Sequence, residues 1–405
     1  MPPIWRAAIA YIVYFFATGA SFPYLPVYYR ALGLGLGTIG LLAALSAATQ
    51  LAAAPAWGAL ADVFGRSRLT LPGAAIVAAS GALTLALVRE PIPVVLAVVV
   101  LSAGLAGISP ILDARTIELL GSDRARYGRV RAWGSVSFVV SAAVCGLLLD
   151  ARGAGALFLV YVPALALTAL IAFSVPRRPS ARQASLRRGA YQLIREPRMG
   201  RFLLGSLLVW MSLSAINGFY SIQIVALGGR PSLVGVAWVI GALVEIPIMW
   251  TFPRLARQFG AERLLVTGSV IFAARAMLAA FAPNAEILVA VAPLEGAGFG
   301  LFFVGGVGFV AARAPTGLTG TAQGVFSATT GLSAIMGTIA AGLLASALSI
   351  PGMFATAGVV GVVAVLVVAD AVRGSLPSAT THSEAVSDAA SITKDGQEVG
   401  HDTAV

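Results

Sequence analysis

Long apolar runs separated by short polar stretches set the pattern of this chain. A helix needs about 20 mostly apolar residues to cross the hydrocarbon core of a bilayer. Runs of roughly that length occur twelve times, at residues 4–29, 38–60, 69–88, 94–112, 132–149, 156–175, 202–227, 233–252, 264–282, 287–312, 318–348 and 351–372. The pattern therefore predicts an all-α integral membrane protein with twelve transmembrane helices.

The composition narrows the classes of protein further. Only 11% of the 405 residues are charged, whereas a soluble domain carries roughly 25% to cover its surface. This shortage excludes a soluble enzyme and an intrinsically disordered chain. The single Cys145 lies in an apolar run, and both histidines, His382 and His401, lie in the final polar stretch. We therefore expect no metal site and no cofactor within the membrane.

The positions of the arginines indicate the orientation in the membrane. If the N-terminus is cytoplasmic, the outer loops carry only Arg30, Arg89, Arg152 and Arg230, and the other loop arginines lie inside. Cytoplasmic loops are enriched in Lys and Arg. We expect a multi-pass protein of the bacterial cytoplasmic (inner) membrane with both termini in the cytoplasm. The net charge of +10 is then explained by contact with the lipid bilayer, without nucleic acid.

One long polar stretch divides the runs six and six. We expect an N-terminal six-helix bundle over residues 1–175, a basic cytoplasmic linker over 176–201 and a C-terminal six-helix bundle over 202–373. Residues 374–405 lack an apolar period and are expected to form a disordered cytoplasmic tail.

The two halves also resemble each other in sequence. When the chain is shifted by 195 positions, Gly40 aligns with Gly235 and Gly65 with Gly260, among other matches. Two pseudo-symmetric six-helix bundles related by a parallel repeat are typical of transporters that work by alternating access. In such proteins the substrate site lies near the middle of the membrane, between the halves.

Five charged residues fall deep in or at the ends of the apolar runs: Asp113, Arg131, Glu245, Arg275 and Glu295. Charges inside a membrane are costly and usually functional. Asp113 and Arg131 lie at equal distances from the turn that joins their runs, and so do Arg275 and Glu295. Antiparallel helices of equal rise therefore place each pair at one depth, which predicts two carboxylate–guanidinium pairs that face a central cavity.

These five charges comprise one more acid than base. An ionised carboxylate without a partner is unfavourable in a low dielectric, so the surplus acid should take up a proton. A carboxylate that binds a proton on one side of the membrane and releases it on the other provides proton coupling. Glu245 and Glu295 are the two candidates.

The sequence GALADVFGRSR, residues 58–68, resembles the cytoplasmic-loop signature of the major facilitator superfamily (MFS). The resemblance implies the MFS fold and a conformational latch, formed by Gly58, Asp62, Gly65 and Arg66, that favours the state closed to the cytoplasm. The glycines would allow close helix approach and a tight turn, and Asp62 would cap a neighbouring helix.

Three further stretches resemble the lactose-permease branch of the superfamily, with its phenylpropionate permeases and nucleoside–proton symporters. They are LDARTIELL (112–120), YGRVRAWGSVSF (127–138) and TAQGVFSATTGLSAIMGTIAAGLL (321–344). The resemblance implies substrate contacts from Asp113, Arg131 and Phe138. It also implies proton coupling through Arg275, Glu295 and Glu245, although Ala292 stands where lactose permease has a histidine.

Two more residues complete the predicted substrate site. Tyr14 lies in the aromatic first run, where it can reach a central cavity, and Asn217 is a polar group within the seventh run. A planar guanidinium suits a carboxylate or a vicinal diol equally. The sequence therefore leaves an aromatic acid, a nucleoside and a sugar-like substrate open.

We interpret the chain as a monomeric secondary active transporter that moves a small organic solute together with a proton by alternating access. Efflux of a drug or metabolite by proton antiport is the alternative, although the fifth run lacks the Gly-Pro signature of such exporters. An intramembrane enzyme would need an acidic metal cluster or a His/Asp/Ser arrangement at a membrane face. The sequence provides neither, so the chain is not expected to be an enzyme.

Overall fold

A computed structural model describes residues 3–63, 69–121, 126–176, 196–315 and 318–373. Over these ranges the chain is helical without any strand, and twelve of its spans are long and apolar enough to cross a membrane. The prediction of an all-α membrane protein with twelve spanning helices is confirmed.

The first half contains spans that run alternately up and down. Its elements are α1 (Pro3–Ser21), α2 (Leu25–Ala31), α3 (Leu36–Val63), α4 (Thr70–Leu87), α5 (Pro91–Leu120), α6 (Tyr127–Arg152), the short 3₁₀ helix η2 (Ala154–Leu157) and α7 (Phe158–Ala172). The first span is interrupted between α1 and α2, where Pro23 and Pro26 occur. Proline removes a backbone donor and clashes with the preceding turn, so the helix cannot continue unbroken.

The second half repeats this arrangement. Its elements are α9 (Pro197–Ala226), α10 (Pro231–Phe259), α11 (Ala261–Ala280), α12 (Ala285–Ala290), α13 (Pro293–Arg313), α14 (Thr319–Leu348) and α15 (Ile350–Val372). The α9 helix begins five residues before the apolar run because the Glu196 side chain caps it, accepting from the backbone N–H groups of Arg198 and Met199.

Two helices are longer than the apolar runs that predicted them. The α5 helix continues to Leu120 and α6 begins at Tyr127, whereas the runs covered 94–112 and 132–149. A helix satisfies its own backbone hydrogen bonds, so it extends past the apolar residues to the membrane surface. Asp113 therefore lies within α5, about two turns from its end, and Arg131 lies within α6, about one turn from its start.

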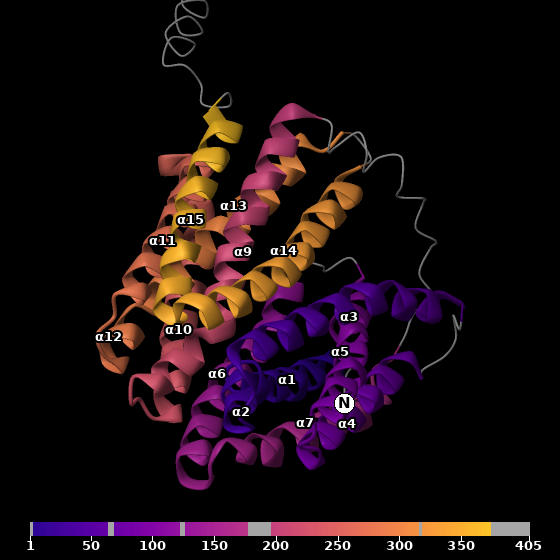
Figure 1. Cartoon of the computed structure of the whole chain (residues 1–405). Coiled ribbons are helices and arrows are strands. Elements are labelled where there is room, and N and C mark those ends of the chain that lie inside the picture. The colour runs from indigo at the N-terminus through magenta and orange to yellow at the C-terminus, as the bar shows by residue number, and fades with distance from the viewer. Residues whose placement is uncertain (1–2, 64–68, 122–125, 177–195, 316–317, 374–405) are drawn as a thin grey trace, which may run out of the picture.

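Each half has its own packing, and few helices connect the two. In the first half α1 packs against α6 and α7, and α4 packs against α5; in the second half α15 packs against α9 and α11. Figure 1 shows the halves as two groups of helices, indigo to magenta and pink to yellow. The main contacts between them are α3 with α14 and α6 with α10.

The two halves meet at one end of the molecule and separate at the other. We call the end where α1 begins and α15 ends the terminal face, and the other end the opposite face. Toward the opposite face, a Cβ added at Gly40 would lie 2.6 Å from Gly342 Cα. There, Asp150 of the first half also accepts a hydrogen bond from the Ser232 backbone N–H of the second half, at 3.0 Å.

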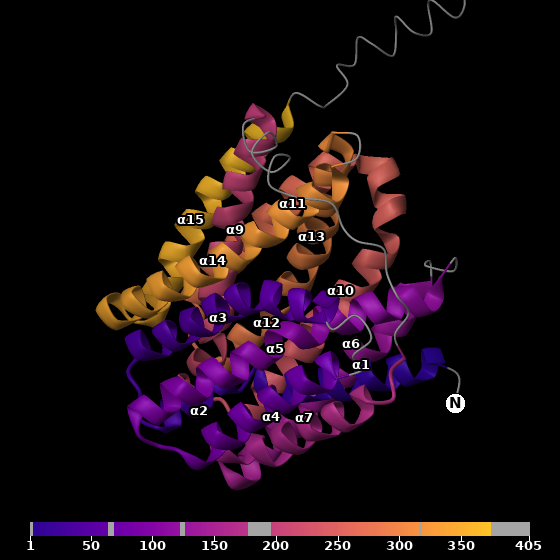
Figure 2. The same cartoon turned by 90° about the vertical axis from the view of Figure 1, so that its right-hand side faces the viewer.

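At the terminal face the same helices are apart. A Cβ added at Gly58 of α3, Gly128 of α6 or Gly320 of α14 would have nothing within 4 Å. Figure 2 shows α3 and α14 close together at one end and diverging toward the other. The molecule is therefore closed at the opposite face and open at the terminal face.

Candidate functional site

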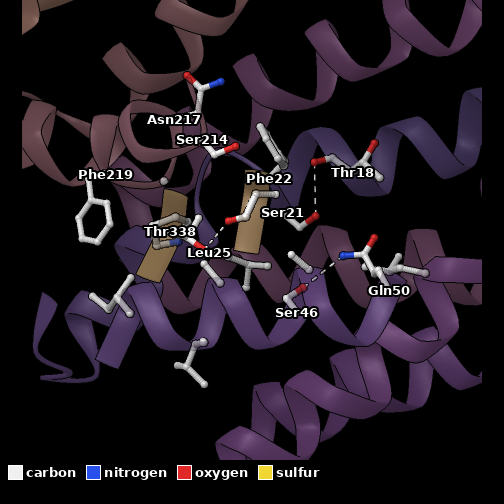
Figure 3. Close-up of a pocket in the computed structure, with 18 of the residues that line it drawn as sticks. Thr18, Ser21, Phe22, Leu25, Ser46, Gln50, Ser214, Asn217, Phe219 and Thr338 are labelled. Carbon is white, nitrogen blue, oxygen red and sulfur yellow. Dashed lines mark hydrogen bonds between the residues drawn. The ribbon is translucent and has the colours of Figure 1, made fainter. Parts of the chain in front are cut away.

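A cavity with a volume of about 580 Å³ lies between the two halves. The first half contributes α1, α2, α3, α5 and α7 to its wall, and the second half contributes α9, α13 and α14. Its polar side chains carry hydroxyl or amide groups; they are Thr18, Ser21, Ser46, Gln50, Ser214, Asn217, Thr338 and the tyrosines Tyr14, Tyr29 and Tyr161. Figure 3 shows Ser46 and Gln50 across the cavity from Ser214 and Asn217. The predicted site residue Tyr14 thus lines the cavity.

A second cavity of about 270 Å³ adjoins the first. It contains two carboxylates, Glu245 and Glu295, inside a wall rich in aromatic rings: Phe15, Phe22, Phe138, Trp238 and Phe299. The rings interlock across the halves, because Trp238 of α10 makes edge contacts with Phe22 at 5.1 Å and Phe138 at 6.2 Å between ring centroids. Asn217 is the one polar residue that lines both cavities.

Close helix contact places the two carboxylates side by side. A Cβ added at Gly296 of α13 would overlap the Gly241 carbonyl oxygen of α10 and lie 2.9 Å from the Glu245 backbone nitrogen. Only glycine allows this approach. Glu295 directly precedes Gly296 in α13, so the close contact at Gly296 brings Glu245 and Glu295 to one cavity.

Arg275 and Glu295 communicate through Asn217. Arg275 is 2% exposed, and its guanidinium carbon lies 4.9 Å from the ring centroid of Tyr220. Its Nη1 donates to Asn217 Oδ1 at 3.0 Å, and Asn217 Nδ2 donates to Glu295 Oε1 at 3.4 Å. The predicted direct ion pair is wrong: among the described residues the two charged groups have no nitrogen–oxygen contact within 4.0 Å. The amide from α9 lies between them, which spacing along α11 and α13 alone does not reveal.

The predicted pair of Asp113 and Arg131 is wrong as well. Asp113 accepts from the hydroxyls of Tyr11, at 2.5 Å, and Ser109, at 3.3 Å. The Arg131 guanidinium lies 5.4 Å from the ring centroid of Phe15, and no ion pair joins it to Asp113 in the described part of the chain.

The physical reason is that α5 and α6 follow each other in the chain but hardly touch. The α5 helix packs against α3 and α4, whereas α6 packs against α1 and α10. Equal depth brings side chains together only when the two helices are packed neighbours. Neither Asp113 nor Arg131 lines the two cavities.

Glu245 differs from the other buried charges. It is half-buried and faces the smaller cavity. Within the residues that the structure describes, its carboxylate has no hydrogen bond and no ion pair. Glu295 has its amide link to Arg275, so of the two acids that line the smaller cavity Glu245 is the one without a hydrogen bond or ion pair to a described residue.

Sequence reasoning missed several residues of the site. Trp238, Ser214 and Thr338 line the cavities, and Tyr11 holds Asp113. Small hydroxyl residues and a tryptophan are common throughout membrane helices, so nothing in their spacing marked them.

The predicted latch lies largely outside the described residues. The side chain of Asp62 and all of Gly65 and Arg66 are not described. Gly58 is described and exposed, and the close helix approach expected there is absent because the halves are apart at the terminal face.

Comparisons with known proteins extend these observations. A model of the MFS_1 like family matches residues 4–356. The maltose permease of Geobacillus stearothermophilus is 30% identical over 360 residues, covering 88% of this chain and 91% of that protein. The probable 3-phenylpropionic acid transporter of Escherichia coli (strain K12) is 26% identical over 274 residues, covering 65% and 70%.

Solved structures share the fold at low sequence identity. The nucleoside transporter NupG matches with a TM-score of 0.81 at 18% identity, covering 92% of this chain and 99% of that one. A bacterial homolog of the human lysosomal transporter Spinster, solved in an inward-facing and unoccupied conformation, matches with a TM-score of 0.75 at 14% identity, covering 92% and 96%. These relatives and neighbours are membrane transporters, not enzymes. Together with the two six-helix halves around a shared cavity, the family match shows that this chain is a transporter of the MFS_1 like family within the major facilitator superfamily.

Proposed function

We propose that this protein is a proton-coupled symporter that takes up a small organic solute by alternating access. The solute binds in the larger cavity, and the proton binds in the smaller one. In the described state the cavities lie between halves that are apart at the terminal face and closed at the opposite face. Rocking of the halves about the α3–α14 and α6–α10 contacts would expose the same site to the other side.

The unpartnered carboxylate of Glu245 is the observation that carries this proposal. An ionised acid next to aromatic rings, without an ion pair or a hydrogen-bond donor among the described residues, is costly in the low dielectric of the membrane. Carrying a proton removes that cost. Glu295, in contrast, accepts a hydrogen bond from Asn217, which in turn accepts one from Arg275.

The names of the relatives support three classes of solute. Their names refer to maltose, 3-phenylpropionic acid and nucleosides, which are the sugar, aromatic-acid and nucleoside classes that the sequence left open. We place the terminal face in the cytoplasm of a bacterial cell because the described arginines Arg129, Arg257 and Arg263 lie at helix ends on that face.

Replacement of Glu245 tests the coupling. Wild-type protein in proteoliposomes with an inward proton gradient is expected to accumulate maltose, uridine or 3-phenylpropionate against its gradient. Glu245→Gln is expected to lose uphill accumulation but to keep solute exchange across the membrane, since exchange needs no net proton movement. Glu286→Gln, an exposed acid on α12, is the matched control and should accumulate as the wild type does.

Full uphill accumulation by Glu245→Gln contradicts the proposal. The direction of proton flow separates symport from the alternative of efflux by antiport. Addition of solute outside should make the external medium more alkaline for a symporter and more acidic for an antiporter.

A further inference from the structure

The wall of the larger cavity indicates which kind of solute it takes. None of the residues around its volume of about 580 Å³ is Asp, Glu, Lys, Arg or His. Transfer of a charged group from water into such a site is costly unless an opposite charge or several hydrogen bonds compensate. We propose that the transported solute is uncharged and carries hydroxyl groups on a ring with an apolar face. This inference rests on the proposed function and assigns the substrate class of that site.

Three hydroxyl groups of the wall already donate to backbone carbonyl oxygens of their own helices. Thr18 donates to the Phe15 carbonyl oxygen at 3.0 Å, Ser21 to the Thr18 carbonyl oxygen at 3.3 Å and Thr338 to the Ala334 carbonyl oxygen at 2.7 Å. A hydroxyl has one proton, so each of these groups then offers only lone pairs to the cavity. A ligand that fits them must donate hydrogen bonds. Solute hydroxyls can donate, whereas an ionised carboxylate can only accept.

The smaller cavity adds a second argument against an anion. Glu245 and Glu295 line it, and no cationic residue does. Arg275 is buried behind Asn217 and Tyr220, where its Nη1 is already bonded. Arg131 lines neither cavity. An anionic solute in the smaller cavity would therefore lie next to two acids, with no cationic residue in the described wall of that cavity to compensate.

Aromatic side chains in the wall are the reason that we propose a solute with a ring. Trp210, Phe22, Phe219 and Phe299 line the larger cavity. Flat apolar surfaces stack against aromatic rings, including the C–H face of a sugar or the base of a nucleoside. Asn217 and Ser214 lie on the same helix, α9, at a spacing of three residues that places both on one face. They provide polar contacts at the boundary with the acids.

Binding of matched compounds tests this inference without any transport. The fluorescence of Trp210 and Trp238, which line the two cavities, provides the signal on purified protein. The first set consists of three compounds that share one scaffold and differ in charge: neutral 3-phenylpropanol, anionic 3-phenylpropionate and cationic 3-phenylpropylamine. Two pairs extend it, namely maltose with maltobionate and uridine with uridine 5′-monophosphate.

We expect at least one neutral member to bind, and to bind about tenfold or more tightly than its charged counterparts, which corresponds to about 1.4 kcal/mol. Equal or tighter binding of a charged counterpart, or failure of all three neutral compounds to bind, overturns the inference. Failure of the proposed function looks different: the neutral solute would bind and cross the membrane without proton flow.

Substitutions in the wall test the acceptor argument with the neutral ligand. Thr18→Val and Thr338→Val should each weaken its binding about tenfold, because an isosteric methyl group replaces an acceptor, whereas Thr18→Ser should bind as the wild type does. Thr267→Val is the matched control, since Thr267 makes the same kind of bond to its own helix but is exposed on α11. Wild-type affinity in both cavity variants would contradict the assignment of these hydroxyls as acceptors.

Discussion

At the scale of the residue, the charges in the membrane are organised by polar neighbours rather than by direct ion pairs. Asn217 links Arg275 to Glu295, and Tyr11 holds Asp113. A neutral amide or hydroxyl between two charged groups provides them with hydrogen bonds. A direct buried salt bridge is held more rigidly, and the desolvation of its two charges is costly. Such links can exchange partners when a proton arrives, and a direct buried pair would resist that change.

Replacement of Asn217 should reveal the value of this link. Asn217→Leu removes two hydrogen bonds and leaves Arg275 and Glu295 buried without the amide, so we expect a loss of about 1–3 kcal/mol in the free energy of unfolding. Thermal unfolding of the purified protein, followed by fluorescence, measures it. Thr84→Val, at an exposed hydroxyl on α4, should change stability by less than about 0.5 kcal/mol. Equal stability of the two variants would mean that the Asn217 bonds contribute nothing.

At the scale of the element, glycines determine how closely the halves approach. Gly40 of α3 packs on Gly342 of α14, and Gly235 of α10 packs on the Ala142 carbonyl of α6. Gly40 and Gly235 are partners in the 195-residue repeat, so the two seams that close the opposite face are related by the internal symmetry. Close backbone contact through small residues is a general means of helix association in membranes.

A single methyl group at either seam should open the opposite face. A Cβ at Gly40 would lie 2.5 Å from the Thr338 carbonyl oxygen, and one at Gly235 would lie 2.7 Å from that of Ala142. Gly40→Ala and Gly235→Ala should therefore shift the population toward the state that is open there.

Electron–electron distances between spin labels at Gly35→Cys and Leu348→Cys, one in each half, measure this opening. The natural Cys145 is fully buried and should remain unlabelled. Gly308→Ala, at an exposed position of α13 where an added Cβ meets nothing within 4 Å, is the control and should leave the distances unchanged. An unchanged distribution in both seam variants would show that the seams can relax without opening.

At the scale of the whole molecule, the structure is open at one end and closed at the other, as expected for one state of the alternating access that we propose. The cavities lie between halves that touch near the opposite face and part at the terminal face. The latch sequence would act in the reverse state, because Gly58 has no close neighbour in this one. Which face is cytoplasmic decides the direction in which this state is open.

Labelling of intact cells should establish the orientation. A membrane-impermeant maleimide is expected to react with Gly35→Cys, in the loop at the opposite face, and not with Gly320→Cys at the start of α14 on the terminal face. Both positions have space for a side chain, since an added Cβ meets nothing within 4 Å. After the cells are permeabilised, both should react. The reverse pattern would place the terminal face outside the cell and would contradict the arginine argument.

The apolar runs predicted the number and type of the helices, because these depend on local composition and periodicity. That the two halves are related by a repeat stays a prediction. Helix ends were less predictable, as the extension of α5 to Leu120 shows. The in-span charges Glu245 and Glu295 were found from the sequence, and the structure brings both to one cavity. Their roles in coupling remain predictions.

The sequence by itself determined that this chain is an integral membrane protein, since it has too few charged residues to cover a surface that faces water. Only the tertiary structure decided which of the charged side chains come into contact. Equal depth suggested two ion pairs, but α5 and α6 pack against other helices, and Asn217 from α9 separates the second pair. The depth of a residue along a helix is a local property that its position in the sequence determines. Which helices pack side by side depends on the shapes of all the helices together, so the spacing within one segment does not predict it.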